Sequence, residues 1–228
     1  MDSLSAERIE RGLDTCFVGR SLLYLAETGS TNDDASRLAR AGAPEGTLAV
    51  ADYQSTGRGR LARRWLAPPS SSLLLSLVFR PRLHPSQAQR LTMICALAGA
   101  ATVESQTGLH VDIKWPNDLL CDGAKVGGIL TELVLTGDQI DFVVVGLGLN
   151  VNLEPAQLGH NLLMPVTSLS HELERSVPRL PLLWAYLREV EARYLALKAG
   201  HSPVAEWTDH LITLGQQIKV SGLDRVLE

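Results

Sequence analysis

Residues 125–150, KVGGILTELVLTGDQIDFVVVGLGLN, are the stretch that decides the fold. Two runs rich in Val, Ile and Leu, about 125–135 and 139–150, flank Gly137 and Asp138. Branched and aromatic residues favour strands, and a Gly-Asp pair between two such runs is typical of a hairpin turn. The stretch therefore predicts a long antiparallel hairpin.

The sequence on either side of this hairpin predicts shorter strands mixed with helices. Helices are predicted at 4–12, from 31 or 32 to about 41, and at 85–108, 177–200 and 203–213, and strands at 22–26, 47–53, 72–79, 111–115 and 216–220. Strands and helices do not alternate strictly, so a doubly wound sheet is disfavoured. We expect an α+β fold with a mixed, mostly antiparallel sheet packed with helices.

Composition limits the class of protein. The 228 residues are 45% hydrophobic and 20% charged, which fits a globular chain with a sizeable core and excludes a disordered or collagen-like one. Three distant cysteines without a CxxC pair predict neither a disulfide framework nor a zinc site, which favours the cytoplasm. No signal peptide and no membrane span are predicted. The net charge, 21 − 25 = −4, argues weakly against a nucleic-acid binder.

Residues 57–65, GRGRLARRW, place four arginines within seven positions. No hydrophobic period runs through 54–69, and Pro68 and Pro69 close the segment, so a loop is predicted. Glycine admits positive φ and close backbone approach, and arginine donates to carboxylates and phosphates in a fork. This glycine–arginine loop, residues 54–69, therefore suits a bound phosphate or carboxylate.

Other interpretations of the glycine–arginine loop must be weighed. Gly57, Gly59 and Ala62 match the dinucleotide pattern GxGxxA, but that pattern must open a helix, and two prolines follow instead. A P-loop is excluded because the chain has no Gly-Lys pair. A nucleic-acid patch and a merely solvated basic loop stay open at this point.

A second polar stretch is residues 114–118, KWPND, followed by Lys125. The chain has four lysines, and Lys114 and Lys125 are two of them. Pro116 ends a strand and fixes a turn, which puts Asn117 and Asp118 at its mouth. Oxygen ligands of this kind can hold Mg²⁺, and Lys125 can bring a compact charge into a cleft. An Asn-Asp turn beside a surface lysine is the simpler alternative.

Gly146 and Gly148 interrupt the apolar run that ends at Asn150. Glycines inside a strand leave room for a flat ligand or a crossing backbone. Asn150 can both donate and accept, as adenine recognition requires. A bulge with a polar strand end would explain the same residues.

Ser30, Thr31 and Asn32 stand where a helix is predicted to begin, and Gln54 follows a predicted strand. We expect Ser30 or Thr31 to cap the helix, with Thr31 and Asp34 at the spacing of a capping pair. Capping and ligand binding are compatible, because a helix N-terminus also binds polar ligands.

Taken in order, these motifs resemble those of biotin protein ligases (biotin–acetyl-CoA-carboxylase ligases). The resemblance covers residues 20–220 or so and rests on five motifs: Ser30-Thr31-Asn32, Gln54 with GRGR at 57–60, KWPND at 114–118, KVGG at 125–128 and GLGLN at 146–150. Each motif could arise by chance, but all five in this order are highly specific. The implied fold is the biotin ligase catalytic domain, which is similar to class II aminoacyl-tRNA synthetases.

The resemblance implies a two-step, ATP-dependent reaction with Mg²⁺. The carboxylate of biotin attacks the α-phosphate of ATP, giving biotinyl-5′-AMP and pyrophosphate. A lysine of the biotin carboxyl carrier domain of acetyl-CoA carboxylase then attacks this adenylate. The partners implied are therefore biotin, ATP and the carrier protein.

The resemblance also implies a role for each matched residue. Lys125, Arg60 and Arg58 are expected to be catalytic. Biotin contacts are expected from Ser30, Thr31, Asn32, Gln54, Arg58, Gly59, Arg60 and Lys125. ATP or adenylate contacts are expected from Arg63, Trp65, Lys114, Asn117 and Asn150, and the Mg²⁺ contact from Asp118.

The chain departs from the family pattern in three places. Ala62 stands where the family often has glycine, which stiffens the loop slightly. The Ser-Thr-Asn motif already begins at residue 30, which leaves no room for the N-terminal helix-turn-helix of bifunctional members. We therefore expect a monofunctional ligase that binds no operator DNA and no membrane; a homodimer is compatible with this. Residues 1–213 are expected to form the catalytic domain, and 214–228 to start an incomplete SH3-like β-barrel, truncated or divergent.

Three alternatives to the biotin ligase stay open. A lipoate or octanoate ligase or transferase of the same superfamily would need an acyl-chain tunnel. A non-catalytic biotin or biotinyl-adenylate binding protein has no need of Lys125 and Asp118. A nucleic-acid binder would gather the loop arginines with other basic residues on one face.

Overall fold

The computed structural model describes residues 3–158, 164–218, 220–221 and 226–227. Its strands are β1 (Leu22–Leu25), β2 (Leu48–Ala51), β3 (Ser72–Phe79), β4 (Asp112–Lys114), β5 (Asp118–Cys121), β6 (Ala124–Thr136), β7 (Gln139–Asn150), β8 (Val220–Ser221) and β9 (Val226–Leu227). Its α-helices are α1 (Ala6–Arg11), α2 (Thr31–Arg40), α3 (Gln89–Thr107), α4 (Leu169–Leu173), α5 (Arg179–Lys198) and α6 (Val204–Asp209). Single 3-10 turns are η1 (Arg60–Ala62), η2 (Pro85–Gln87) and η3 (Pro155–Leu158).

Seven strands form one sheet in the order β1-β2-β3-β7-β6-β5-β4. β1 and β2 are parallel, and every other neighbouring pair in this sheet is antiparallel. The β6–β7 hairpin predicted from the sequence is confirmed, and β7 lies in the middle of the sheet between β3 and β6. The expected mixed, mostly antiparallel α+β sheet is therefore confirmed.

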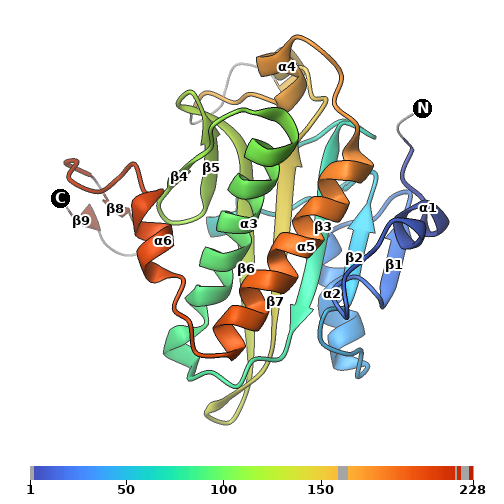
Figure 1. The fold of residues 1–228 in the computed structure, drawn as a ribbon, viewed down its shortest axis with the longest axis vertical. Helices are drawn as coiled ribbons and strands as arrows, with labels where there is room; N and C mark the ends of the chain where they lie inside the picture. The colour runs from blue at the N-terminus through green and yellow to red at the C-terminus, as the bar shows by residue number, and fades with distance from the viewer. Residues whose placement is uncertain (1–2, 159–163, 219, 222–225, 228) are drawn as a thin grey trace.

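The two faces of this sheet are covered very differently. α3 and α5 lie across one face (Figure 1), where alternate residues of β7 from Val143 to Leu149 join the main core. On the other face α2 packs Ala35 and Ala39 against Val78, Phe142 and Val144. α2 has ten residues, so it covers only part of its face. The remaining part of that face is where β7 carries glycine.

Several boundaries differ from the sequence prediction. β5 was missed, because its four residues directly follow the turn at Pro116 and Asn117 and are too few to show a period. α6 ends at Asp209 rather than near 213, and α3 begins at Gln89 after a separate 3-10 turn. In the C-terminal tail β8 and β9 form an antiparallel pair. Residues 219, 222–225 and 228 lie outside the described residues, and the barrel stays a prediction.

The structure also shows the state of the three cysteines and allows a search for a membrane-spanning helix. Cys16, Cys95 and Cys121 are free thiols, and Cys95 and Cys121 are buried. Burial raises the pKa of both buried thiols to about 12, so they stay protonated near neutrality. Across the described ranges, no helix combines the length and the apolar character that crossing a bilayer requires.

A buried carboxylate fastens the N-terminal segment to the helical layer. Glu191 of α5 is 7% exposed and accepts hydrogen bonds from the backbone N–H groups of Cys16 (2.7 Å), Phe17 (2.8 Å) and Val18 (3.0 Å). Burial alone would raise the pKa of Glu191, but these backbone donors outweigh it, and the pKa lies below its usual value. The ionised form therefore stabilises the fold.

We expect Glu191→Gln to lower the free energy of unfolding by about 1.5–3 kcal/mol at neutral pH, the scale of hydrogen bonds to a charged group. Because the folded-state pKa is lowered, the stabilisation is complete above the usual glutamate pKa of about 4.3 and disappears as the pH falls through the lowered value. Urea unfolding of both proteins against pH checks this. A difference that persists unchanged into acid would contradict it.

Candidate active site

A cleft of about 760 Å³ opens on the sheet face that α2 only partly covers. The start of α2, the glycine–arginine loop, the β4–β5 turn and β6 and β7 surround it, and Met164, Thr213 and Ile218 also reach it. Among the residues that line it are Ser30, Thr31, Asn32, Gln54, Arg58, Gly59, Arg60, Arg63, Trp65, Lys114, Asn117, Asp118 and Lys125. The structure thus brings together every site residue named from the sequence except Asn150.

The floor of the cleft depends on two glycines of β7. A Cβ on Gly146 would lie 2.1 Å from Asn32 Oδ1, and a Cβ on Gly148 would lie 2.5 Å from the Trp65 ring. Real Cβ atoms do not approach other atoms this closely, so neither position accepts a larger residue without displacement. The room that the sequence predicts at these glycines is taken by Asn32 and Trp65.

Polar side chains fill the end of the cleft next to α2. The Thr31 N–H donates to Gln54 Oε1 (2.7 Å), and Ser76 Oγ donates to Asn32 Oδ1 (2.6 Å) and lies 2.8 Å from Thr31 Oγ1. Thr31, Asn32 and Ser76 are all buried. Ser76 was missed in the sequence, although a lone hydroxyl inside the apolar run of β3 was a signal for it.

The expected capping of α2 is wrong in its details. Ser30 occupies the N-cap position, but its side chain makes no capping hydrogen bond. Gln54 instead takes the Thr31 N–H, and Asp34 accepts from Thr28 Oγ1 (2.6 Å) rather than pairing with Thr31. A side chain distant in sequence satisfies the helix start, which leaves the Ser30 hydroxyl free of a capping role.

The glycine–arginine loop folds back on itself. The Trp65 N–H donates to the Gly57 carbonyl (2.9 Å), and the Gly59 N–H donates to the Arg63 carbonyl (2.7 Å). A Cβ on Gly57 would lie 2.6 Å from the Trp65 carbonyl oxygen, so this close approach needs glycine. Positive φ occurs elsewhere in the loop, at Leu61 (56°) and Ala62 (58°).

Two cationic side chains have defined partners beside the β4–β5 turn. Lys125 Nζ lies 2.5 Å from Asp118 Oδ1 and 5.5 Å from the centre of the Trp65 ring. Arg60 Nη1 lies 3.5 Å from Asn117 Oδ1, and Asn117 Nδ2 donates to the Ile129 carbonyl (2.6 Å). The turn is thereby fixed to β6, and Lys125 is held in place above the floor.

The cleft is strongly cationic although the chain is acidic. Its lining includes Arg58, Arg60, Arg63, Arg64, Lys114 and Lys125. Asp118 is the one carboxylate among the described residues of the lining. The lining alone gives a balance of 6 − 1 = +5, and counting Asp33 and Glu132, which pair with Arg58 at the rim, leaves 6 − 3 = +3, compared with −4 for the chain. Such a cleft attracts and orients anionic ligands.

Two buried polar atoms near the floor have no hydrogen-bond partner within the described part of the chain, Trp65 Nε1 and Asn150 Oδ1. Asn150 is 2% exposed, and its Nδ2 donates to the Thr167 carbonyl (3.0 Å). It does not line the cleft, but strand alternation puts it on the same face as Gly146 and Gly148. The two atoms differ in character, since the indole N–H is a donor and the amide oxygen an acceptor.

The residues present fit a metal that arrives with a ligand rather than a resident one. The described ranges contain no group of three or more His, Cys, Asp or Glu residues able to hold a metal. Asp118 offers one carboxylate, with the Asn117 amide oxygen beside it in the lining. Mg²⁺ commonly binds through one or two carboxylates together with substrate phosphates.

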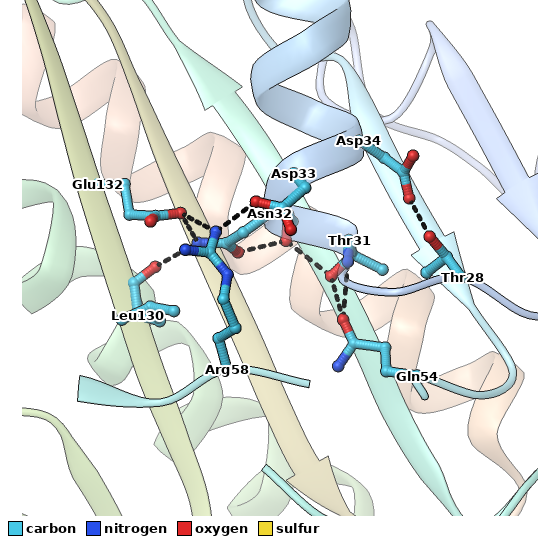
Figure 2. A network of polar contacts seen from close by, with 10 residues as sticks. Thr28, Thr31, Asn32, Asp33, Asp34, Gln54, Arg58, Leu130 and Glu132 are labelled. Carbon is cyan, nitrogen blue, oxygen red and sulfur yellow. Dashed lines mark hydrogen bonds and ion pairs between the residues drawn. The ribbon is translucent and has the colours of Figure 1, made fainter. Parts of the chain in front are cut away.

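A network of polar contacts at the rim, which the sequence did not reveal, involves Asp33 and Glu132. Figure 2 shows the Arg58 guanidinium between their carboxylates, at 2.6 Å from Asp33 Oδ1 and 2.9 Å from Glu132 Oε2. Glu132 Oε2 also accepts from Asn32 Nδ2 (2.7 Å). Glu132 interrupts an apolar strand, and this is the signal that could have drawn attention to it.

Gly146→Ala is expected to lower the free energy of unfolding by about 1–3 kcal/mol, the usual cost of overpacking, because its Cβ displaces Asn32. In an Asn32→Ala background the obstructing atom is absent, so the same substitution should cost much less. A double-mutant cycle by denaturant unfolding measures this. Equal costs in the two backgrounds would contradict the packing described for the floor.

Known proteins resemble this chain in sequence and in structure. Residues 25–150 match the Biotin/lipoate A/B protein ligase family. The biotin–[acetyl-CoA-carboxylase] ligase of Mycobacterium tuberculosis is 32% identical over 234 residues, covering 96% of this chain and 83% of that protein. The bifunctional ligase/repressor BirA of Bacillus subtilis is 35% identical over 223 residues, covering 97% and 69%.

The likeness extends to solved structures. The biotin protein ligase from Aquifex aeolicus in complex with biotin and ATP superimposes with a TM-score of 0.73 at 27% identity, over 91% of this chain and 85% of that one. The family match, the relatives that align with nearly all of this chain and this structural neighbour agree with the motifs and the cleft. The chain therefore belongs to the biotin protein ligase family.

Proposed function

We propose that this protein is an ATP-dependent biotin–protein ligase. In the first step, the biotin carboxylate attacks the α-phosphate of ATP, so that an O–P bond forms and pyrophosphate leaves. In the second step, the ε-amine of a carrier lysine attacks the acyl carbon of biotinyl-5′-AMP, an amide forms, and AMP leaves. The carrier proposed is the biotin carboxyl carrier domain of acetyl-CoA carboxylase, and the compartment proposed is the cytoplasm.

The observation that carries this proposal is the cationic cleft above a glycine floor. Both reactants of the first step are anions, and their repulsion opposes the approach of the carboxylate to phosphorus. Fixed positive groups remove this repulsion and stabilise the charge of the transition state. An acidic chain that gathers six cations around one cleft suits this chemistry.

We assign to Lys125 the contact with both reacting groups, the biotin carboxylate and the α-phosphate of ATP. Asp118 and the Trp65 ring hold its ammonium group above the floor. Arg60 and Arg63, both exposed on the loop and both lining the cleft, are the residues that we assign to the phosphates. A compact point charge suits the reacting oxygens, and the guanidinium forks suit the phosphate oxygens.

The two ends of the cleft suit the two ends of the adenylate. We assign the biotin end to Ser30, Thr31 and Gln54, because a ureido ring needs both donors and acceptors. We assign the adenine end to Trp65 and Asn150, whose unpartnered polar atoms match an edge that donates and accepts. We place the reacting atoms beside Lys125, which lies against the Trp65 ring.

Mg²⁺ belongs to this proposal as the companion of ATP. Asp118, with Asn117, would hold it, and when bound it supplies charge neutralisation for the polyphosphate. The chain's own residues align the carboxylate and the phosphate. The glycine–arginine loop lies over the cleft and would keep water from the adenylate, which hydrolyses readily.

Transfer of labelled biotin to a purified carrier domain tests the proposed function. We expect transfer to require biotin, ATP and Mg²⁺ together, and an excess of lipoate or octanoate not to compete. Efficient competition by either acid would favour the lipoate branch of the superfamily. Tight biotin binding without transfer or pyrophosphate exchange would indicate a non-catalytic binding protein.

Lys125→Met is expected to lower biotin-dependent ATP–pyrophosphate exchange by about 30- to 150-fold, or 2–3 kcal/mol, the scale of one preorganised donor. Lys198→Met is the matched control, because Lys198, the last residue of α5, pairs with Glu45 and does not line the cleft. The control should retain its exchange rate. Exchange in Lys125→Met at the rate of the control would rule out the role given to Lys125.

A further inference from the structure

The guanidinium of Arg58 ties the glycine–arginine loop to two elements that are distant from it in sequence. Its Nη2 lies 2.6 Å from Asp33 Oδ1 on α2 and 2.9 Å from Glu132 Oε2 on β6 (Figure 2). The loop arginine therefore bridges a helix start and a central strand. Among the loop arginines, Arg60, Arg63 and Arg64 form no ion pair with any carboxylate of the described residues.

Glu132 connects this contact with the polar end of the cleft. Its Oε2 accepts from both Arg58 Nη2 and Asn32 Nδ2, at 2.9 and 2.7 Å. Asn32 is 3% exposed, and its Oδ1 accepts from the fully buried Ser76, which in turn lies 2.8 Å from Thr31 Oγ1. One carboxylate oxygen thus links the position of the loop to the side chains at the start of α2.

The local charge does not favour a further anion on Arg58. One guanidinium between two carboxylates gives a sum of +1 − 2 = −1. An anionic ligand approaching Arg58 would meet the field of Asp33 and Glu132, or would have to displace one of them. Arg60 and Lys125 face the cleft with a more favourable balance, since the former has no carboxylate partner and the latter has one.

We propose that Arg58 is a positioning residue: it latches the glycine–arginine loop over the cleft through Glu132 and leaves the anion contacts to Arg60 and Lys125. This inference rests on the proposed function, because the loop that it positions is the one that would retain the adenylate. The same Glu132 Oε2 accepts from Asn32 Nδ2, so the contact that holds the loop is built on the polar end of the cleft.

Glu132 is the stronger of the two partners of Arg58. The Asp33 side chain is 64% exposed, and an exposed ion pair contributes little because water screens it. The Glu132 side chain is 33% exposed and accepts a second hydrogen bond from a buried amide, so its geometry is fixed before Arg58 arrives. A fixed acceptor loses less conformational entropy when the pair forms.

Glu132→Gln separates the latch from the rest of the network. The glutamine amide oxygen still accepts from Asn32 Nδ2, but the charge that attracts Arg58 is gone. Trypsin can cut the open loop after Arg60, Arg63 or Arg64, and Glu132→Gln removes none of these sites. We expect this variant to be cut about tenfold faster, the scale of one charge-assisted hydrogen bond, and Asp33→Asn less than about twofold faster.

Glu206→Gln is the matched control, since it breaks an exposed ion pair with Arg193 that involves no residue lining the cleft. It should leave loop cleavage unchanged. Cleavage of Glu132→Gln at the wild-type rate would overturn the latch. This arm needs no ligand, so it tests the latch even if the protein fails to form an adenylate.

The second arm measures how fast labelled biotinyl-5′-AMP leaves the protein. We expect Arg58→Met and Glu132→Gln each to release it about tenfold faster. The double variant should release it no faster than the more severe single variant, because both substitutions break the same Arg58–Glu132 contact. Slower adenylate formation in Arg58→Met, with normal formation and retention in Glu132→Gln, would show that Arg58 contacts the anion and overturn the proposal. No adenylate in the wild type would reject the proposed function instead.

Discussion

The absence of side chains at Gly146 and Gly148 is the constraint on which the rest of the site depends. β7 lies in the middle of the sheet, and its alternate residues before Gly146 are the large apolar Phe142 and Val144, packed under α2. At the glycines the strand offers no side chain, so the partners that pack on this face change. The face is filled instead by Asn32 and by Trp65.

This constraint also divides the charged residues into two groups. Arg179 has a structural role: it is fully buried and donates to Asp52 (2.8 Å) and the Ser72 carbonyl (3.3 Å). Others project from the loop above the glycine floor with solvent around them. Desolvating a charge costs several kcal/mol unless partners replace the water, which explains why the buried arginine is bonded to a carboxylate and a carbonyl. Of the loop arginines, Arg60, Arg63 and Arg64 have no carboxylate partner among the described residues and keep their charge available for a ligand.

Most of the sheet could be predicted from the sequence, because β3, β6 and β7 are long runs rich in apolar and branched residues. The β5 strand could not, since four residues after a turn give no pattern. The loop glycines were expected to serve positive φ and close backbone approach; Gly57 serves close approach, whereas the positive φ values occur at Leu61 and Ala62. Glycine adopts positive φ at the least cost, but in this loop tertiary contacts hold Leu61 and Ala62 at positive φ.

The residues of the cleft could be predicted from the sequence, because each motif indicates one type of chemistry. The contacts between residues of different motifs could not be predicted. The Thr31–Gln54 and Arg58–Glu132 contacts join residues 23 and 74 positions apart, and no local period encodes them. Alternation along β3 and β6 would have placed Ser76 and Glu132 on the face of Gly146. Alternation could not predict that the Glu132 carboxylate accepts from both Arg58 and Asn32.

The most direct test of the central claim, that the glycine floor carries the activation of biotin, is a crystal structure with a stable analogue of biotinyl-5′-AMP. We expect the ring of biotin beside Thr31 and Gln54, the phosphate between Lys125 and Arg60, and the adenine toward Trp65 and Asn150. An analogue bound on the face under α3 and α5, or bound in the reverse direction along the cleft, would contradict it.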